Sequence, residues 1–424
     1  MRSFFAVGAV IVSASLIGIG SPQAQEDLWV PDLPLTRNTG VSARALGMGG
    51  AYLAISDDGA ALRHNPAGLT RIRRIEFAGS FIDRAIDMKT TDHGSQGIAE
   101  MTKMRIAGLS FVYPFPTYRG SMVMGLGYHV PHILDRNYVR AGETSEGWRE
   151  EELFDEGTVG EWSFGLAIDF TPEVSLGFRL TRIYGSRFRD WRFENAEVTP
   201  AWHETNDLTV SGYTASGGAL IQILPTTQLG LVLDLPRWLH NEVETTYEDG
   251  SIGVAEDDMT LPFSLGAGVA SHLKNLLLTA DVRMTDWTQI DYEGPMRYVD
   301  ESGQRQQAYR RTWDIHVGAE YLLDLSDELP LRLRAGFAME PVPYEAVFED
   351  IDFPSPEDEG VPVYSEGTFD PNRRYFTFGA GTLLAQSMTI DIAYATGTFT
   401  REGGTLVEKE DERRVMMTAG FRLQ

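Results

Sequence analysis

The stretch Trp162-Ser163-Phe164-Gly165-Leu166-Ala167-Ile168-Asp169-Phe170 alternates without a break: its even positions are large and apolar, and its odd positions are small or acidic. A period of two is typical of a β-strand with two different faces, because successive side chains point to opposite sides of a sheet. The same alternation recurs in segments 276–285, 313–321, 331–337 and 388–394. The sequence therefore predicts an all-β protein.

The connections between these segments separate two architectures that share the alternation, a soluble β-sandwich and a transmembrane β-barrel. Strand candidates start near residues 73, 103, 120, 158, 173, 206, 227, 259, 275, 311, 330, 374, 387 and 413. Short links fall at residues 170–173, 224–227, 271–274, 324–327 and 385–387. Long links fall around residues 86–102, 131–157, 188–205, 240–258, 290–310, 342–372 and 399–412. Short turns that alternate with long loops through an even number of strands are typical of a barrel in the outer membrane of a Gram-negative cell. We therefore predict a 14-stranded antiparallel transmembrane barrel.

The large apolar faces of these strands carry no charged residue. This agrees with a lipid-facing surface, where a Lys or Arg near the bilayer midplane costs roughly 2–4 kcal/mol. The apolar phase of the strand near Lys103 shifts between Ile106 and Leu109, which predicts a β-bulge.

Composition excludes several other classes of protein. The chain has 424 residues, a net charge of −25 and no cysteine. Its excess of acidic residues would repel nucleic-acid phosphates, and it has no thiols for a disulfide scaffold or a thiolate metal site. After the first 20 residues no apolar run is long enough for a membrane helix. Residues 1–25, with Arg2 before an uncharged apolar run, are predicted to be a secretory signal peptide, since no Lys or Arg cluster follows to support a membrane anchor instead.

One segment upstream of the first strand does not alternate. It is rich in glycine, which permits close backbone approach and unusual dihedral angles. Asp57 or Asp58 is expected to cap a short helix through Ala60-Ala61-Leu62, and Asn65-Pro66 to end it. A compact segment of this kind is suited to fold inside a barrel as a plug. We therefore predict three regions: the signal peptide at 1–25, a hatch at 26–72 and the barrel at 73–424.

The segment from Arg44 to Leu69 carries a resemblance. It has Gly-Met-Gly-Gly-Ala near its start, Asp-Asp at its centre and Asn-Pro-Ala-Gly near its end. With these three motifs it resembles the N-terminal hatch of the outer-membrane hydrophobic-compound transporters, a family that includes FadL and the toluene transporters. Looser matches at 261–266, 286–288 and 333–338 extend the resemblance to the end of the chain. The hatch residues that match are Gly47, Gly49, Gly50, Asp57, Asp58, Asn65, Pro66 and Ala67.

The resemblance implies passive uptake of hydrophobic compounds, such as long-chain fatty acids or aromatic hydrocarbons. The partners that the resemblance implies are a hydrophobic small molecule or lipid as ligand, and the lipid and lipopolysaccharide of the surrounding outer membrane. In such transporters a kink in the third strand opens a lateral gap near the Asn-Pro-Ala of the hatch, so that the ligand leaves sideways. The third strand here contains Gly125 and Gly127, and glycines inside a strand often mark a bend. The alternative is that these glycines leave room for the plug.

A second function is compatible with the same hatch. PorV-type barrels share the motif and act as partners of a secretion complex, which implies an envelope protein partner instead of a transported solute. The hatch residues do not separate the two functions.

Neither catalysis nor a cofactor is indicated. The eight histidines are scattered, with no metal-ligand spacing, and inward-facing charges are expected to form ion pairs, so we predict no catalytic residue, no metal ligand and no enzyme activity. Two acidic loops, at residues 143–156 and 349–366, are expected to be solvated, with cation binding as the alternative. Such a rim would repel a fatty carboxylate unless cations intervene.

Overall fold

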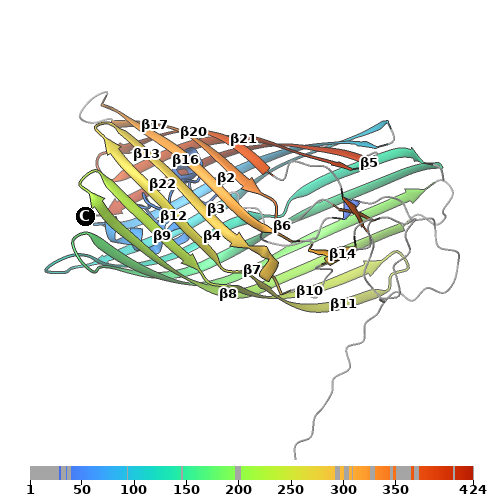
Figure 1. Ribbon diagram of the computed structural model, residues 1–424, viewed down its shortest axis with the longest axis horizontal. Coiled ribbons are helices and arrows are strands. Elements are labelled where there is room, and N and C mark those ends of the chain that lie inside the picture. The colour runs from blue at the N-terminus through green and yellow to red at the C-terminus, as the bar shows by residue number, and fades with distance from the viewer. Residues whose placement is uncertain are drawn as a thin grey trace, which may run out of the picture.

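The computed structural model is a ring of antiparallel strands around an N-terminal plug (Figure 1). The structure describes residues 28–29, 35, 40–92, 94–144, 147–195, 202–291, 297–299, 305–307, 309–324, 330–343, 347–349, 364–366, 372–403 and 406–423. The wall is built from β2 (Ile75–Asp92), β3 (Ser95–Phe115), β4 (Met122–Ile133), β5 (Arg136–Thr144), β6 (Gly147–Asp169), β7 (Val174–Asn195), β8 (Trp202–Leu224), β9 (Thr227–Asp234), β10 (Arg237–Tyr247), β11 (Ile252–Leu261), β12 (Ser264–Leu273), β13 (Leu276–Asp286), β16 (Arg311–Asp324), β17 (Pro330–Pro341), β20 (Asn372–Leu384), β21 (Met388–Gly403) and β22 (Leu406–Leu423).

The remaining elements are short. The plug contains α1 (Ala43–Gly47), α2 (Ala61–His64) and the 3-10 helix η1 (Pro66–Arg71), and a second 3-10 helix is η2 (Trp287–Gln289). Two small sheets are formed by β1 (Leu28–Trp29) with β18 (Val347–Glu349) and β19 (Tyr364–Glu366), and by β14 (Arg297–Val299) with β15 (Arg305–Gln307). No helix in the described ranges is long and apolar enough to cross a membrane. The predicted signal peptide lies outside the described residues.

The wall closes on itself. Each strand pairs with the next along the chain, and β22 pairs with β2 from Ile75 with Leu423 to Thr91 with Val407. Three wall strands consist of two successive segments each, namely β4 with β5, β9 with β10 and β11 with β12. The 17 segments of the sheet therefore make 14 strands. The predicted 14-stranded antiparallel barrel is confirmed.

The two ends of the barrel differ. At one end, which we call the short-turn end, the connections are brief, such as residues 170–173 between β6 and β7 and 385–387 between β20 and β21. At the other, the hairpin end, the strands continue as long paired ribbons. Much of the sequence predicted as loop at 86–102, 131–157 and 240–258 belongs to these strands, and that prediction was wrong in this respect. Beyond the lipid the outer face meets water, which removes the apolar alternation there, while the backbone pairing continues.

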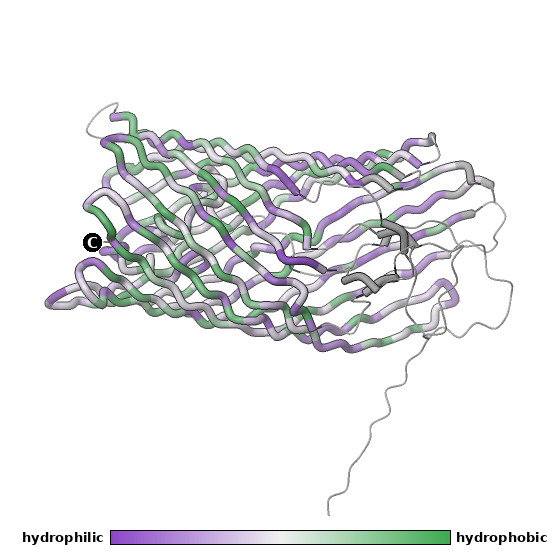
Figure 2. Tube along the Cα trace, viewed as in Figure 1, coloured by the Kyte–Doolittle hydropathy of each residue, from purple (hydrophilic) through white to green (hydrophobic). Residues whose placement is uncertain are grey.

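An apolar band surrounds the barrel next to the short-turn end (Figure 2). Outward-facing side chains there include Phe164, Leu166, Phe178 and Leu180, all of them exposed. The band ends at a row of exposed side chains that are in register across neighbouring strands, since Trp162 pairs with Tyr128 and Arg182, and Tyr213 with Arg182 and Trp238. Aromatic residues prefer the membrane–water interface. The row therefore marks one edge of the membrane-spanning region.

The predicted bulge is confirmed. The register between β2 and β3 shifts where Ser80 pairs with Gly108 and Phe81 with Ile106, which leaves Ala107 as the extra residue. This shift explains why the apolar phase of β3 changes along the strand.

The position of the band can be tested on β7. Phe178 is 47% exposed on the lipid face, and Tyr184 lies six residues further along the same face, beyond Arg182 of the aromatic row. We expect Phe178→Arg to lower the free energy of unfolding by about 2–4 kcal/mol and Tyr184→Arg by about 0–1 kcal/mol, because the cost of a charge falls toward the interface. Guanidinium titrations in phospholipid vesicles measure both values. Equal costs at the two positions would contradict this placement of the membrane.

Candidate functional site

Ion pairs attach the hatch to the barrel wall inside the lumen. The guanidinium of Arg44 in α1 pairs with Asp57 of the hatch and lies 3.3 Å from the carboxylate of Glu320 on β16. These two acids outweigh the effect of burial and raise the pKa of Arg44 well above its ordinary value. The same guanidinium lies 5.7 Å from the ring centroid of Tyr52. Arg44 therefore connects the two halves of the hatch to the wall.

Hydrogen bonds to the hatch backbone come from many strands. The amides of Ala43, Leu53 and Gly59 donate to Thr418, Asp281 and Glu76, and the carbonyls of Gly47, Gly49 and Leu62 accept from Thr377, His316 and Arg179. Because these wall residues lie on β2, β7, β13, β16, β20 and β22, the hatch is held from most sides. The predicted hatch inside the lumen is confirmed.

The glycines of the hatch lie where backbone meets backbone. Gly49 has φ +66°, and a Cβ there would lie 2.6 Å from the backbone nitrogen of Phe337. Gly50 has φ +80° and faces the ring of His316, while Gly47 contacts Gly379. A side chain at Gly49 would push the hatch away from β16 and β17.

Asn65, Pro66 and Ala67 pack against β7 and β8. The side-chain amide of Asn65 donates to the carbonyls of Leu53 at 2.8 Å and Ala219 at 3.1 Å, and its side-chain oxygen accepts from the amide of Ala67 at 3.1 Å. The motif thus begins η1 and joins two parts of the hatch to the wall. A Cβ at Gly218 would lie 2.1 Å from the Asn65 side-chain oxygen, and one at Gly177 would lie 2.2 Å from the Ala67 nitrogen.

The short helix predicted after the two aspartates is α2, and it ends at Asn65 as expected. Its N-cap is Ala60, which has no side-chain cap, so the predicted capping role of Asp57 or Asp58 was wrong. Asp58 instead accepts from the Ala60 amide at 3.0 Å and from the Tyr52 hydroxyl at 2.8 Å. Burial, followed by the nearby charges of Asp57 and Glu76, raises the pKa of the Asp58 carboxyl to about 7 despite the opposing effect of Arg44.

Gly125 and Gly127 lie in a regular part of β4. Both are paired on the two sides, Gly125 with Val112 and Gly165, and Gly127 with Ser110 and Ser163. A Cβ at Gly125 would meet Leu62 of the hatch at 3.1 Å, and one at Gly127 would meet it at 2.9 Å. The contacts of these glycines are those expected of residues that leave room for the plug.

Strand pairing is interrupted a few residues further along. β3 pairs with β4 only as far as Gly108 with His129, and the register of β4 against β6 shifts between His129 and His132. The next segment, β5, pairs with β6. The backbone of β5 also lies next to β2, since the Thr90 hydroxyl on β2 donates to the Val139 carbonyl on β5. Within the described residues, β3 from 95 to 107 is paired only with β2. We call segment 130–135 the interruption.

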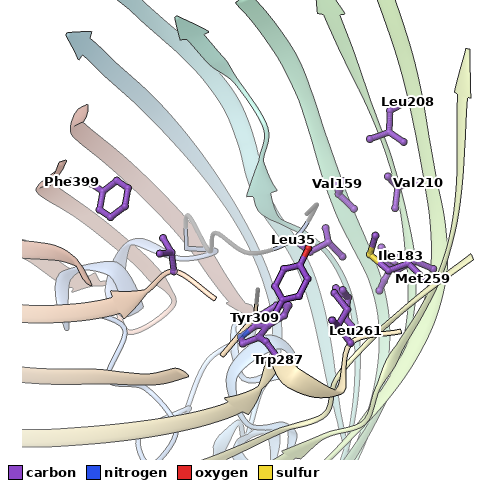
Figure 3. Close-up of a cluster of buried hydrophobic side chains, with 13 residues drawn as sticks. Leu35, Val159, Ile183, Leu208, Val210, Met259, Leu261, Trp287, Tyr309 and Phe399 are labelled. Atoms are coloured by element: carbon purple, nitrogen blue, oxygen red, sulfur yellow. The ribbon is translucent and has the colours of Figure 1, made fainter. Parts of the chain in front are cut away.

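Apolar side chains fill the lumen beyond the hatch (Figure 3). Val159, Ile183, Leu208 and Val210 project inward from β6, β7 and β8, and Trp287 and Tyr309 lie next to one another inside the ring. We call this set the apolar cluster; its members are Leu35, Val159, Ile183, Leu208, Val210, Leu239, Met259, Leu261, Trp287, Ile290, Tyr309, Val342 and Phe399. The lumen of a transmembrane barrel is ordinarily polar. The apolar cluster is therefore a specific feature that suits an apolar ligand.

A cavity of about 140 Å³ separates the hatch from the apolar cluster. We call it the central cavity. Gly49, Gly50 and Leu53 of the hatch line one side, while Leu261 and Trp287 of the apolar cluster line another. His132 of the interruption also lines it, so the cavity reaches the place where β3 and β4 lose their pairing. Arg63, whose guanidinium lies 3.2 Å from Glu161, and Arg283 add polar groups.

Solved structures share this architecture. A FadL homologue from Pseudomonas aeruginosa aligns with a TM-score of 0.59 and 16% identity, over 91% of this chain and 98% of that one. The toluene transporter TodX from Pseudomonas putida aligns with a TM-score of 0.58 and 15% identity, over 92% and 100%. The toluene transporter TbuX from Ralstonia pickettii gives 0.57 and 16%, over 92% and 100%. The chain has the fold of these transporters.

No protein-family model and no curated protein sequence matches the chain. At the sequence identities above, the likeness to FadL, TodX and TbuX concerns the fold. The hatch, the central cavity and the apolar cluster are observations on this barrel itself.

The sequence predicted the hatch motif but missed the apolar cluster and the interruption. A signal for the cluster is present, because Val159, Ile183 and Val210 stand on the strand phase that is otherwise small or polar. Apolar residues in both phases mark a strand that is buried on both faces. The interruption has Pro131 between two histidines as its sequence signal, since proline removes a backbone donor from the ladder.

The fit of Asn65 against β8 provides a matched pair of variants. A Cβ at Gly218 would collide with the Asn65 side chain, whereas one at the adjacent Gly217 would meet nothing within 4 Å. We expect Gly218→Ala to loosen the hatch and Gly217→Ala to leave it unchanged. Hydrogen exchange of hatch peptides reports the difference as faster exchange over residues 60–72 in Gly218→Ala only. Equal protection in both variants would show that this contact does not hold the hatch.

Proposed function

We propose that the protein is an outer-membrane barrel for passive uptake of hydrophobic compounds, with long-chain fatty acids and aromatic hydrocarbons as the two ligand classes to test. The observation that carries the proposal is the apolar cluster inside the lumen. Apolar side chains such as Ile183 and Val210 give a ligand that is poorly soluble in water a favourable environment, at roughly 25 cal/mol per Å² of apolar surface removed from water. The likeness of the fold to the toluene transporters supports the same function.

We propose that the hairpin end faces the cell exterior and the short-turn end the periplasm. This orientation follows the ordinary layout of outer-membrane barrels, with short periplasmic turns and long external connections. A ligand would then enter at the hairpin end, contact the apolar cluster first and reach the central cavity above the hatch.

Lateral exit at the interruption is the route that the geometry favours. The hatch blocks the axial path with hydrogen bonds to six strands, whereas His132 joins the central cavity to segment 130–135. Val130 and Ile133 of this segment pack with Leu46 of the hatch and with Ala107 on β3 in an apolar group. Segment 130–135 follows Tyr128 of the aromatic row, so an apolar ligand that passes this lining would reach the membrane at the edge of its hydrocarbon region. The adaptor function stays a prediction, and no contact described above favours it over uptake.

Uptake assays on β8 variants test the role of the apolar cluster. Val210→Asn places an amide in the apolar cluster, while Thr209→Asn places the same amide on the opposite face of the same strand. We expect Val210→Asn to lower the uptake rate about tenfold, because a polar group in an apolar site weakens ligand binding by about 1.4 kcal/mol or more, and Thr209→Asn to match the wild type. Radiolabelled oleate and toluene, offered to liposomes that contain the protein, give both rates. Wild-type uptake by Val210→Asn would refute the assigned role.

A bulky residue at the interruption tests the exit. Ala107 is the first β3 residue past the last β3–β4 pair and is fully buried, whereas Leu109 faces lipid two residues away. We expect Ala107→Trp to slow delivery to the membrane at least about fivefold while leaving ligand bound in the lumen, since added side-chain volume fills the route. Leu109→Trp is the control. Lipid-phase fluorescence of a labelled fatty acid measures delivery, and unchanged delivery in Ala107→Trp would remove the lateral route. Heat-modifiable gel mobility confirms that each variant forms a barrel.

A further inference from the structure

A second and larger cavity lies at the short-turn end, on the other side of the hatch from the central cavity. Its volume is about 1350 Å³, and we call it the mouth cavity. The hatch contributes Arg44, Ile55 and Asp57 to its lining, and the link from the hatch to β2 contributes Arg71 and Arg74. The proposed uptake route does not pass through it.

The charge of the mouth cavity is opposite to that of the chain. Seven arginine and lysine side chains but only two carboxylates, Asp57 and Glu320, belong to its described lining. The chain as a whole has 36 basic and 61 acidic residues. A wall of one sign around a low-dielectric cavity concentrates ions of the other sign. The mouth cavity therefore attracts anions from the compartment that the short turns face.

Three of the basic groups have no acidic partner among the residues that the structure describes. The guanidinium of Arg71 donates only to the amide oxygen of Gln228, at 3.3 Å, and that of Arg74 only to the carbonyl of Gln386, at 3.0 Å. In the described part of the chain no carboxylate lies within 4 Å of either guanidinium or of the Lys274 ammonium. Both carboxylates in the lining are already engaged, since Asp57 pairs with Arg44, and Glu320 with Arg44 and Arg334. Arg71, Arg74 and Lys274 are thus available to a ligand.

The size and position of the mouth cavity restrict its occupant. Its volume exceeds the 300–1,000 Å³ that is typical of small-molecule pockets. Arg44 lies in the hatch, inside the ring of strands, whereas Arg74 and Lys274 are exposed beside the short turns. Leu277, Leu322 and Pro330 add apolar surface to the lining. A peptide segment with both acidic and apolar side chains matches this combination of volume, position and chemistry.

We propose that the mouth cavity binds an acidic, partly apolar segment of a partner protein on the short-turn side. Carboxylates of that segment pair with Arg71, Arg74 and Lys274. The segment also touches the hatch, because Arg44 and Asp57 belong to the same lining. This partner site is separate from the site for the transported compound.

A binding assay with defined peptides tests the proposal. The full chain is placed in nanodiscs of zwitterionic lipid, and fluorescence anisotropy is measured with a labelled octapeptide of alternating aspartate and leucine. We expect binding by the wild type, and at least about tenfold weaker binding by the triple variant Arg71→Gln, Arg74→Gln, Lys274→Gln. The matched control removes three exposed cations at the hairpin end, with Arg192→Gln, Lys409→Gln and Arg413→Gln, and should bind as the wild type does.

Further arms identify the source of the signal. An octapeptide of asparagine and leucine should not bind, and the charge-reversed variant with glutamate at positions 71, 74 and 274 should bind an octapeptide of lysine and leucine instead. Equal affinity of the triple variant and the wild type would overturn the proposal, as would competition by millimolar inorganic phosphate, which points to a small-anion site, or binding only to phosphatidylglycerol vesicles. Oleate uptake by the triple variant should equal that of the wild type, so a failure of this proposal is distinguishable from a failure of the uptake proposal.

Discussion

The backbone of a membrane-spanning strand has no water to bond with, so every amide and carbonyl in the hydrocarbon region needs a partner in the protein. The pairing of β22 with β2 meets this requirement for the whole wall. At the interruption, just past Tyr128 of the aromatic row, the ladder between β3 and β4 ends, and charged side chains supply hydrogen bonds instead. Arg84 donates to the backbone carbonyl of Asp135, and the Asp135 carboxylate accepts from Arg105 and from the amide of Gly157. The opening in the ladder is therefore stabilised by a specific set of hydrogen bonds.

The hatch separates two cavities of different chemistry. The central cavity adjoins Leu261 and Trp287 of the apolar cluster and carries charged side chains of both signs, whereas basic side chains predominate in the mouth cavity. Arg44 faces the cationic side and links the hatch to Glu320. A compound on one side and a protein segment on the other would thus contact the same small domain. The hatch is the structural connection between the two proposed activities.

Much of the wall could be predicted from the sequence, because lipid outside and hatch or water inside impose an alternation such as that of Trp162 to Phe170. The same rule explains the failure at the hairpin end. In β5 and β6 beyond the membrane, as at Arg140 and Glu151, both faces meet polar surroundings and the alternation disappears although pairing persists. The bulge at Ala107 was visible because it shifts the phase within the apolar band.

The site was less accessible to sequence reasoning. Glycine and the Asn65-Pro66-Ala67 motif indicated close packing, but which strands they pack against depends on the fold of the whole chain. Gly177 and Gly218 lie far from Asn65 in sequence and carry no mark of their contact with it. The interruption at 130–135 depends on which strand β5 pairs with. That pairing is a long-range property, which the local sequence pattern does not encode.

The contacts of the hatch constrain the order of assembly. The Ala43 amide bonds to Thr418 on the last strand, while Leu62 fits against Gly125 on the third and Asn65 against β8. A closed ring leaves no path for a domain of this size to enter from the side. The Ala43 bond therefore forms only once β22 is in place, so that docking of the hatch is completed no earlier than the addition of the last strand.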